Sequence, residues 1–351
     1  MLSIRLHVLR HGKLTVITMS NIRIGVLGAG VVGVTTALEL QKEYPSASLT
    51  IIADKFGQET TSDGAAGIFR PASSFCGPTE DISRQWINDS YYYYEDIRKS
   101  AEAAHAGVIQ MSGYILSSIN KDIVQNHYLE KLLPLFRRAT EEELSLYPGN
   151  WKYGTFYTTL VTECRKFLPW GMHRFEEAGG QVKNKLLSSF NDVSGDFDMV
   201  VNCLGLGAKY LCSDHNMVPI RGQVLKVNAP WIKTFLHGDF DTYIIPGIEA
   251  VTLGGCRNYD SYDLRVNRHD TASILERCTA LVPSLKKASI IREWVGLRPH
   301  RSPVRVEAEN INGLKVVHNY GHGGYGVTSA PGTAKHAVQL VKKMHSARSK
   351  L

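Results

Sequence analysis

The residues best suited to chemistry in this chain of 351 residues are glycines, gathered in two places. In the first group, Gly28, Gly30 and Gly33 follow the spacing G-x-G-x-x-G. Such glycines permit a tight turn, the approach of a pyrophosphate to the backbone, and close packing of a helix on a strand. Asp54 follows 21 residues after Gly33, where an acid accepts hydrogen bonds from an adenosine ribose and disfavours a 2′-phosphate. The pattern predicts a dinucleotide site.

The neighbouring residues fit the elements that such a site requires. Residues 22–27 are apolar and β-branched, which is typical of a buried strand. Residues 34–43 have a helical pattern that ends near Pro45, and residues 49–53 predict a second strand that ends at Asp54. A helix that begins at the glycines directs free N–H groups and a positive partial charge towards phosphates. A glycine-rich turn without a ligand is the alternative.

The second glycine group lies in the run Gly321-His322-Gly323-Gly324-Tyr325-Gly326. Val327, Thr328 and a predicted helix over 332–344 follow it, so its backbone N–H groups could serve the far end of a long cofactor. A dehydrogenase that releases NAD does not need this second approach to its cofactor. The sequence therefore favours tightly held FAD over NAD.

The spacing of histidines and cysteines does not favour a metal site. His318 and His322 are four residues apart, but the glycines around them disfavour a helix that presents both on one face. The six cysteines form no C-x-x-C pair and no compact framework, which is typical of an intracellular enzyme. We expect no metal.

Composition narrows the class of protein. Hydrophobic residues make up 43% and charged residues 21% of the chain, which excludes disordered and fibrous classes. No stretch reaches about 18 uninterrupted apolar residues, so we expect no membrane-spanning helix. The net charge of +7 is spread along the chain rather than gathered in a basic stripe. We therefore expect no nucleic-acid partner.

The remaining patterns suggest two interleaved domains. Helical patterns cover 80–106, 121–142 and 166–178, and strand-like segments dominate between 223 and 253. We predict an α/β fold in which a Rossmann-type FAD-binding domain is interleaved with an α+β substrate domain dominated by a mixed sheet. The expected boundaries are 20–75, 158–215 and 290–351 for the FAD-binding domain, 76–157 and 216–289 for the substrate-binding domain, and 1–19 for an N-terminal extension.

The two ends of the sequence have features of targeting signals. Residues 1–20 contain basic residues and no acid, which fits either a presequence or an upstream start codon with Met19 as the functional start. The sequence ends in Ser349-Lys350-Leu351, a tripeptide that the peroxisomal import receptor recognises. We expect the protein in the peroxisomal matrix.

Several longer runs resemble the D-amino acid oxidase and D-aspartate oxidase family of peroxisomal flavoproteins. The resemblance covers about residues 20–345. The runs that carry it are 26–33, 54–56, 60–67, 221–223, 243–247, 251–255, 295–299 and 318–326. It implies hydride transfer from a D-amino acid to FAD, hydrolysis of the imino acid to a 2-oxo acid and ammonia, and reoxidation by oxygen to give hydrogen peroxide.

The resemblance also implies roles for particular residues. Arg298 would bind the substrate α-carboxylate as a planar fork. Tyr243 would donate a second hydrogen bond to that carboxylate, and the carbonyl of Gly324 would accept from the substrate amine. No further catalytic side chain is implied, because the protein contributes position and electrostatics. The cofactor would be held by Gly28, Gly30, Val31, Val32, Gly33, Asp54, Lys55, Thr61, Ser62, Ile68, Gly323, Gly324, Tyr325, Gly326, Val327 and Thr328.

Other classes fit these residues less well. A glycine or sarcosine oxidase would share the flavin fold but would lack Arg298 and Tyr243 in these runs. A catalytically silent FAD-binding protein would not need to retain the substrate residues.

Two positions bear on the side chain of the substrate. Members of the family with neutral substrates carry a second tyrosine four residues before the position of Tyr243, and this sequence has Asp239 there. Arg257 resembles a basic residue of the aspartate branch that would pair with a side-chain carboxylate; a surface arginine is the alternative. His237 lies near a further basic position of that branch, and we expect it to be a neutral loop histidine. We predict acidic substrates, D-aspartate and less well D-glutamate, with neutral D-amino acids as the alternative.

Overall fold

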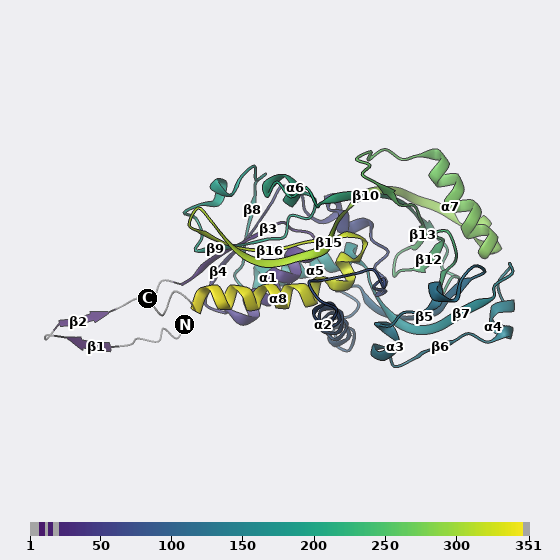
Figure 1. Cartoon of the computed structure of the whole chain (residues 1–351), viewed down its shortest axis with the longest axis horizontal. Helices are drawn as coiled ribbons and strands as arrows, with labels where there is room; N and C mark the ends of the chain where they lie inside the picture. Colours follow the sequence, from purple (N-terminus) through teal and green to yellow (C-terminus); the bar gives the residue numbers. More distant parts are fainter. Residues whose placement is uncertain (1–6, 11–12, 17–20, 347–351) are drawn as a thin grey trace.

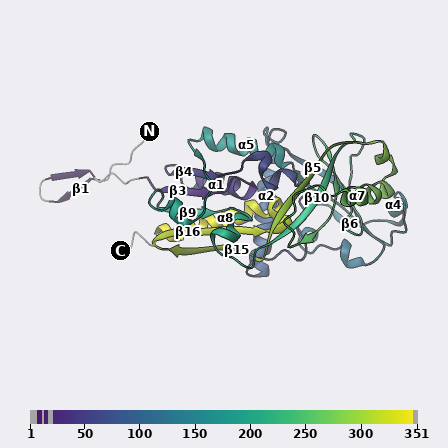
Figure 2. The same ribbon diagram turned by 90° about the horizontal axis from the view of Figure 1, so that it is seen from above.

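The computed structural model describes residues 7–10, 13–16 and 21–346, so the tripeptide Ser349-Lys350-Leu351 lies outside it. Strands β1 (His7–Arg10) and β2 (Lys13–Val16) pair in an antiparallel sheet of their own. The remaining strands form one mixed sheet that extends through the molecule (Figure 1). Figures 1 and 2 both place α7 and α4 at one end of this body and β3, β4 and β9 at the other.

The elements follow one another along this sheet. From one edge to the other the strands are β6 (Phe136–Arg138), β7 (Tyr153–Thr162), β5 (Val108–Ser117), β11 (Phe235–His237), β12 (Tyr243–Pro246), β13 (Val251–Gly254), β10 (Val218–Asn228), β15 (Ser289–Ile311), β16 (Leu314–His322), β9 (Met199–Asn202), β3 (Arg23–Leu27), β4 (Ser48–Ala53) and β8 (Gln181–Asn184), with β14 (Asn258–Tyr259) beside β10. The α-helices are α1 (Val31–Glu43), α2 (Glu80–Arg98), α3 (Leu129–Leu132), α4 (Glu141–Ser145), α5 (Cys164–Glu177), α6 (Gly207–Leu211), α7 (Arg268–Leu281) and α8 (Gly326–Ser346).

The predicted β-α-β unit lies in the parallel half of the sheet. β3 and β4 are parallel neighbours, and α1 connects them. Successive residues of these strands belong to different hydrophobic clusters: Val26 and Ile51 lie in one, and Leu27 and Ile52 lie in another. Both faces of the sheet are therefore buried, which explains why the strands are apolar without alternation.

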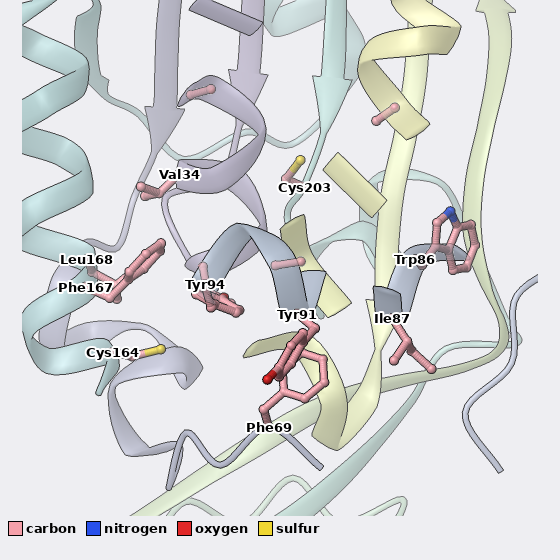
Figure 3. Packing of buried hydrophobic residues seen from close by; sticks show 14 of the residues in the cluster. Val34, Phe69, Trp86, Ile87, Tyr91, Tyr94, Cys164, Phe167, Leu168 and Cys203 are labelled. Atoms are coloured by element: carbon pink, nitrogen blue, oxygen red, sulfur yellow. The ribbon is translucent and has the colours of Figure 1, made fainter. Parts of the chain in front are cut away.

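Helices α1, α2, α5 and α8 pack together on one face of this half. Val34 of α1, Tyr94 of α2 and Phe167 of α5 belong to the same buried cluster (Figure 3). Pro331 lies inside α8 and removes the N–H that would bond to the carbonyl of Val327. The hydroxyl of Tyr94 donates to that carbonyl instead, at 2.8 Å. This contact lets α8 begin at Gly326, earlier than residue 332, where the sequence predicted it.

The antiparallel half is covered by α7. Leu225, Ile244 and Leu253 from three neighbouring strands pack with Ile274 and Cys278 of the helix. β15 joins the two halves, because its first part pairs with β10 and its last part with β16.

Two further helix predictions were wrong in extent. The helix expected over 121–142 is replaced by a 3-10 turn, α3, β6 and α4. The side chain of Asn126 accepts from the N–H groups of Tyr128 and Leu129, and Pro134 then prevents continuation. The helix expected over 80–106 ends at Arg98, and the chain turns before β5.

The described residues contain neither a membrane-spanning helix nor a cluster of metal-binding side chains. None of the helices in residues 21–346 is long and apolar enough to cross a membrane. The same part of the chain contains no group of three or more His, Cys, Asp or Glu side chains arranged to hold a metal ion.

Candidate active site

The turn between β3 and α1 depends on glycine at three positions. Gly28 has φ +107°, and a Cβ there would lie 2.5 Å from the carbonyl oxygen of Cys203. A Cβ on Gly33 would lie 1.9 Å from the carbonyl oxygen of Gly28, and one on Gly30 would lie 3.3 Å from Ser62 Oγ. The backbone can therefore approach a ligand closely at this turn.

The start of α1 is arranged for an anion. The N–H of Val31 donates to Ser62 Oγ at 3.0 Å, and the first turn of the helix contains no acid. The positive end of the helix dipole is therefore not neutralised by the helix itself. Val32 is half-buried in the same turn, and Asp54 and Lys55 are exposed directly after β4.

The second glycine group lies next to the first. Gly323 has φ +57° and begins the short 3-10 turn Gly323–Tyr325 that leads into α8. A Cβ on Gly326 would lie 3.9 Å from Cγ1 of Val31, so the first residues of α1 and α8 are neighbours. Val327 is half-buried and Thr328 is buried at the start of α8. These features fit a cofactor that has a pyrophosphate near α1 and a second part near α8.

The segment with Thr61 and Ser62 is fixed by a buried acid that the sequence did not reveal. Asp63 is 2% exposed and accepts from Arg165 at 3.1 Å and from Arg292 at 2.8 Å. The hydroxyl of Thr61 donates to the carbonyl of Leu297 at 3.3 Å, which connects this segment to β15. Further along, Ile68 forms a bridge with Val161 of β7. The contacts of these residues with a cofactor remain predictions.

Arg298 extends from β15 over glycines of two other elements. A Cβ on Gly222 would lie 2.2 Å from its Nη1 atom, and one on Gly324 would lie 3.4 Å from its Cδ atom. Nη1 donates to the carbonyl of Cys256 at 3.1 Å. Among the residues that the structure describes, no carboxylate pairs with Arg298. Its guanidinium is oriented but keeps donors for an anion.

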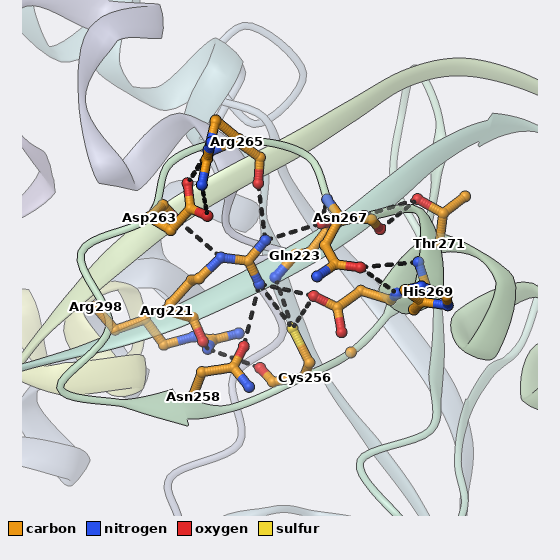
Figure 4. A network of polar contacts seen from close by, with 12 residues as sticks. Arg221, Gln223, Cys256, Asn258, Asp263, Arg265, Asn267, His269, Thr271 and Arg298 are labelled. Atoms are coloured by element: carbon orange, nitrogen blue, oxygen red, sulfur yellow. Dashed lines mark hydrogen bonds and ion pairs between the residues drawn. The ribbon is translucent and has the colours of Figure 1, made fainter.

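A polar network holds the strand beneath Arg298 (Figure 4). Arg221, which is 4% exposed, donates to the carbonyl oxygens of Asp263 and Arg265 and to the carboxylate of Asp270. Gln223 accepts from the N–H of Asn267. These hydrogen bonds hold the loop that follows Cys256 against β10. Because β10 pairs with β15, they also help to position Arg298.

Tyr243 lies on β12 beside two glycines. Cβ atoms on Gly254 and Gly255 would lie 2.1 Å and 2.8 Å from its ring. Burial raises the pKa of Tyr243, while the nearby charge of Arg298 opposes that rise. The hydroxyl is therefore protonated at neutral pH and can donate a hydrogen bond to a carboxylate.

The structure distinguishes among the three positions that bear on the substrate side chain. Arg257 is about half exposed and forms an ion pair with Asp241 at 3.0 Å. Asp239 is buried and accepts from Ser117 Oγ at 2.8 Å and from the N–H of Ser118 at 2.9 Å, so it stabilises a turn. His237 ends β11 rather than lying in a loop. Burial and nearby positive charges hold the pKa of His237 well below its usual range, so it is neutral as expected.

Comparison with known proteins identifies the family. The family model described as FAD dependent oxidoreductase matches residues 23–340. The chain belongs to this family. D-aspartate oxidase from Homo sapiens is 40% identical to this FAD dependent oxidoreductase over 337 residues, covering 94% of this chain and 98% of that protein. A D-amino acid oxidase from Dugesia ryukyuensis is 33% identical and covers 91% of this chain and 97% of its own.

Solved structures agree with this oxidoreductase fold. The crystal structure of glycine oxidase from Geobacillus kaustophilus superposes with a TM-score of 0.76 at 19% identity, covering 92% of this chain and 95% of that chain. The predicted fold class is confirmed, and so are FAD as the cofactor and oxidation as the activity. The division into two domains and the roles of single residues remain predictions.

Proposed function

We propose that this oxidase deaminates D-amino acids and prefers acidic ones, D-aspartate above D-glutamate. The Cα–H and amine of the substrate lose two electrons and two protons to form an imino acid, and water converts that product to a 2-oxo acid and ammonia. FAD, when bound, supplies the electron acceptor, and oxygen takes the electrons onward to give hydrogen peroxide.

The residues of this chain bind and orient the substrate. Arg298 binds the α-carboxylate through two parallel N–H donors, and the protonated Tyr243 hydroxyl donates a further hydrogen bond. The exposed Gly324, which contacts the stem of Arg298, offers its carbonyl to the amine. Together these contacts fix the Cα–H in one direction, which is the main contribution expected of the protein.

The observation that carries the acidic preference is a second cation near Tyr243. The charge of Arg257 acts on both Tyr243 and His237. A dianionic substrate needs a positive partner for its distal carboxylate, since an unpaired buried carboxylate is strongly unfavourable. The name of the human relative, D-aspartate oxidase, supports the same preference.

One observation favours the alternative, a neutral D-amino acid oxidase. Asp241 is paired with Arg257, and this pairing neutralises the charge that would attract a distal carboxylate. The name of the planarian relative fits this alternative.

Substrate preference separates the two functions. We expect kcat/KM for D-aspartate to exceed that for D-alanine by roughly 10- to 100-fold, because only an acidic side chain gains charged hydrogen bonds from a second cation. Asp241→Asn should raise kcat/KM for D-aspartate selectively by releasing Arg257, whereas Arg257→Met should lower it. Arg23→Met, which removes another half-exposed arginine that pairs with an acid, is the matched control. Equal kcat/KM for D-alanine and D-aspartate in the unmodified enzyme would establish the neutral alternative.

We also propose import into the peroxisome through Ser349-Lys350-Leu351, which the peroxisomal import receptor would bind. A fluorescent protein that carries the last ten or so residues of this sequence should enter peroxisomes. The same fusion with Leu351→Asp should stay in the cytosol. Cytosolic fluorescence from both fusions would show that the tripeptide is not an import signal.

A further inference from the structure

Three buried polar atoms without hydrogen-bond partners belong to residues that lie near one another at the sheet, and the family resemblance indicated a basic position near only one of them, His237. In residues 21–346, six buried side-chain nitrogen or oxygen atoms have no hydrogen-bond partner. Three of them are Arg70 Nε, Tyr157 Oη and His237 Nε2. Buried polar groups are almost always paired. A cluster of unpaired donors therefore offers a place for an acceptor from a bound molecule.

The sheet explains why Tyr157 and His237 are close. Tyr157 on β7 and Phe235 on β11 both face Gly113 on β5. Because Gly113 has no side chain, the two rings meet across it, with centroids 4.8 Å apart. His237 follows Phe235 by two residues and lies on the same face, with ring centroids 6.1 Å apart.

Arg70 reaches this face from a segment that is fixed on both sides. The N–H of Phe69 donates to the carbonyl of Leu160 at 2.8 Å, and Thr159 Oγ1 donates to the carbonyl of Phe69 at 2.8 Å. Asn126 Nδ2 donates to the carbonyl of Pro71 at 2.7 Å. The backbone before and after Arg70 is therefore held against β7 and the loop beside it.

The charge of Arg70 acts on the other two residues, which agrees with the backbone contacts that bring it near β7. Its positive charge contributes to the low pKa of His237, after burial. Burial also raises the pKa of Tyr157, and the charge of Arg70 opposes that rise. His237 is therefore neutral and the Tyr157 hydroxyl is protonated, so both can donate to an anion.

The positive charge of Arg70, unlike that of Arg257, is not neutralised by an acid in the described part of the chain. Arg257 is paired with Asp241. Within the described part of the chain, no acid pairs with Arg70. The cluster offers a guanidinium, a phenol hydroxyl and an imidazole N–H, with one net positive charge. This donor set fits one carboxylate.

The cluster is adjacent to the substrate residues. His237 is the cross-strand partner of Tyr243, and their ring centroids are 5.8 Å apart. Tyr243 in turn lies close enough to Arg298 to sense its charge. Tyr243 is therefore flanked by Arg298 on one side and by the cluster of Arg70, Tyr157 and His237 on the other.

We propose that Arg70, with Tyr157 and His237, binds the side-chain carboxylate of an acidic D-amino acid whose α-carboxylate lies on Arg298. This inference rests on the proposed function and deepens it. Arg70 is then the main determinant of acidic specificity, and Arg257, which is half exposed and paired with Asp241, contributes less.

The test compares the unmodified holoenzyme with Arg70→Met. We expect kcat/KM for D-aspartate to fall by roughly 30-fold or more and kcat/KM for D-alanine to change by less than about 3-fold. Tyr157→Phe, which removes only the unpartnered hydroxyl, should lower kcat/KM several-fold for D-aspartate but not for D-alanine. Arg70→Lys keeps the charge and should recover part of the loss. Arg23→Met, which removes a half-exposed arginine paired with Asp198 at the start of β3, is the control for loss of an arginine away from the site.

Binding of two probes gives a readout that does not depend on turnover. Succinate has the two carboxylates of aspartate without the amine, and propionate has the single carboxylate of alanine. Calorimetric titration should show weaker succinate binding in Arg70→Met and in Tyr157→Phe, with propionate unchanged. Thermal unfolding and FAD content establish that each variant is folded.

The outcomes distinguish the inference from the function on which it rests. Suppose the unmodified enzyme prefers D-aspartate but Arg70→Met lowers kcat/KM equally for D-aspartate and D-alanine. That result would overturn the inference about Arg70 and leave the proposed function standing. If Arg70→Met did not fold, the other two variants would decide: unchanged succinate affinity in both Tyr157→Phe and Arg70→Lys would overturn the inference about Arg70. A wild-type preference for D-alanine would overturn the proposed function itself.

Discussion

Replacement of Arg298 by Ala is expected to lower kcat/KM by roughly 30-fold or more for acidic and neutral D-amino acids alike, because each loses its charged hydrogen bonds to the α-carboxylate. Arg298→Lys should not restore the rate fully, since a point charge cannot reproduce the two parallel donors of a guanidinium. Steady-state oxygen uptake over several substrates measures both effects.

Two controls show whether the loss in Arg298→Ala comes from the missing α-carboxylate contact. FAD content must be equal in the variant and in the unmodified enzyme, because Arg298 contacts the glycine segment that leads into α8. Arg70→Met serves as the counterpart, since it should affect acidic substrates only. An Arg298→Ala enzyme with bound FAD and an unchanged kcat/KM would show that the α-carboxylate binds elsewhere.

Replacement of Gly33 by Ala is expected to abolish stoichiometric FAD binding and to lower the free energy of unfolding by about 1–3 kcal/mol or more, the usual cost of forcing extra atoms into a packed site. The new Cβ would lie 1.9 Å from the carbonyl oxygen of Gly28, a backbone atom that cannot move without moving the turn. The absorption spectrum of the purified protein and its thermal unfolding measure the two losses.

Gly207→Ala is the matched control for Gly33→Ala. Gly207 also lies in the first turn of a helix, and a Cβ there would meet its nearest atom at an ordinary 3.4 Å. The control should keep both FAD and stability. If Gly33→Ala purified with one FAD per chain and an unchanged unfolding temperature, the turn would not be the tight site described here.

Local patterns in the sequence predicted the parallel half of the sheet well. The glycine spacing and the apolar runs before and after it are sufficient to predict β3, α1 and β4, because each depends on residues close in sequence. The region 121–142 shows the limit of such patterns. Its helical periodicity was real but short, and the hydrogen bonds that Asn126 accepts and the break at Pro134 outweighed it.

Residues of the candidate site could be predicted only where they lie in recognisable sequence motifs. Arg298, Tyr243 and Gly324 lie in runs that resemble the family, and the structure brings Arg298 close to both of the others. Asp63 and Arg70 follow no spacing rule, because Asp63 pairs with Arg165, 102 residues away, and no acid in the described part of the chain pairs with Arg70. The pairing of Asp241 with Arg257 depends on a turn in which Asp241 has φ +56°, a conformation that the sequence did not indicate.

Bound FAD is expected to accept electrons from an acidic D-amino acid, and anaerobic reduction of the flavin tests this most directly. The purified enzyme is mixed with D-aspartate in the absence of oxygen while the visible absorbance of its flavin is followed. We predict that D-aspartate bleaches the flavin rapidly, that admission of oxygen restores the colour with formation of hydrogen peroxide, that D-alanine bleaches more slowly, and that L-aspartate has no effect. A flavin that keeps its colour with D-aspartate, or that D-alanine reduces faster, would contradict the account.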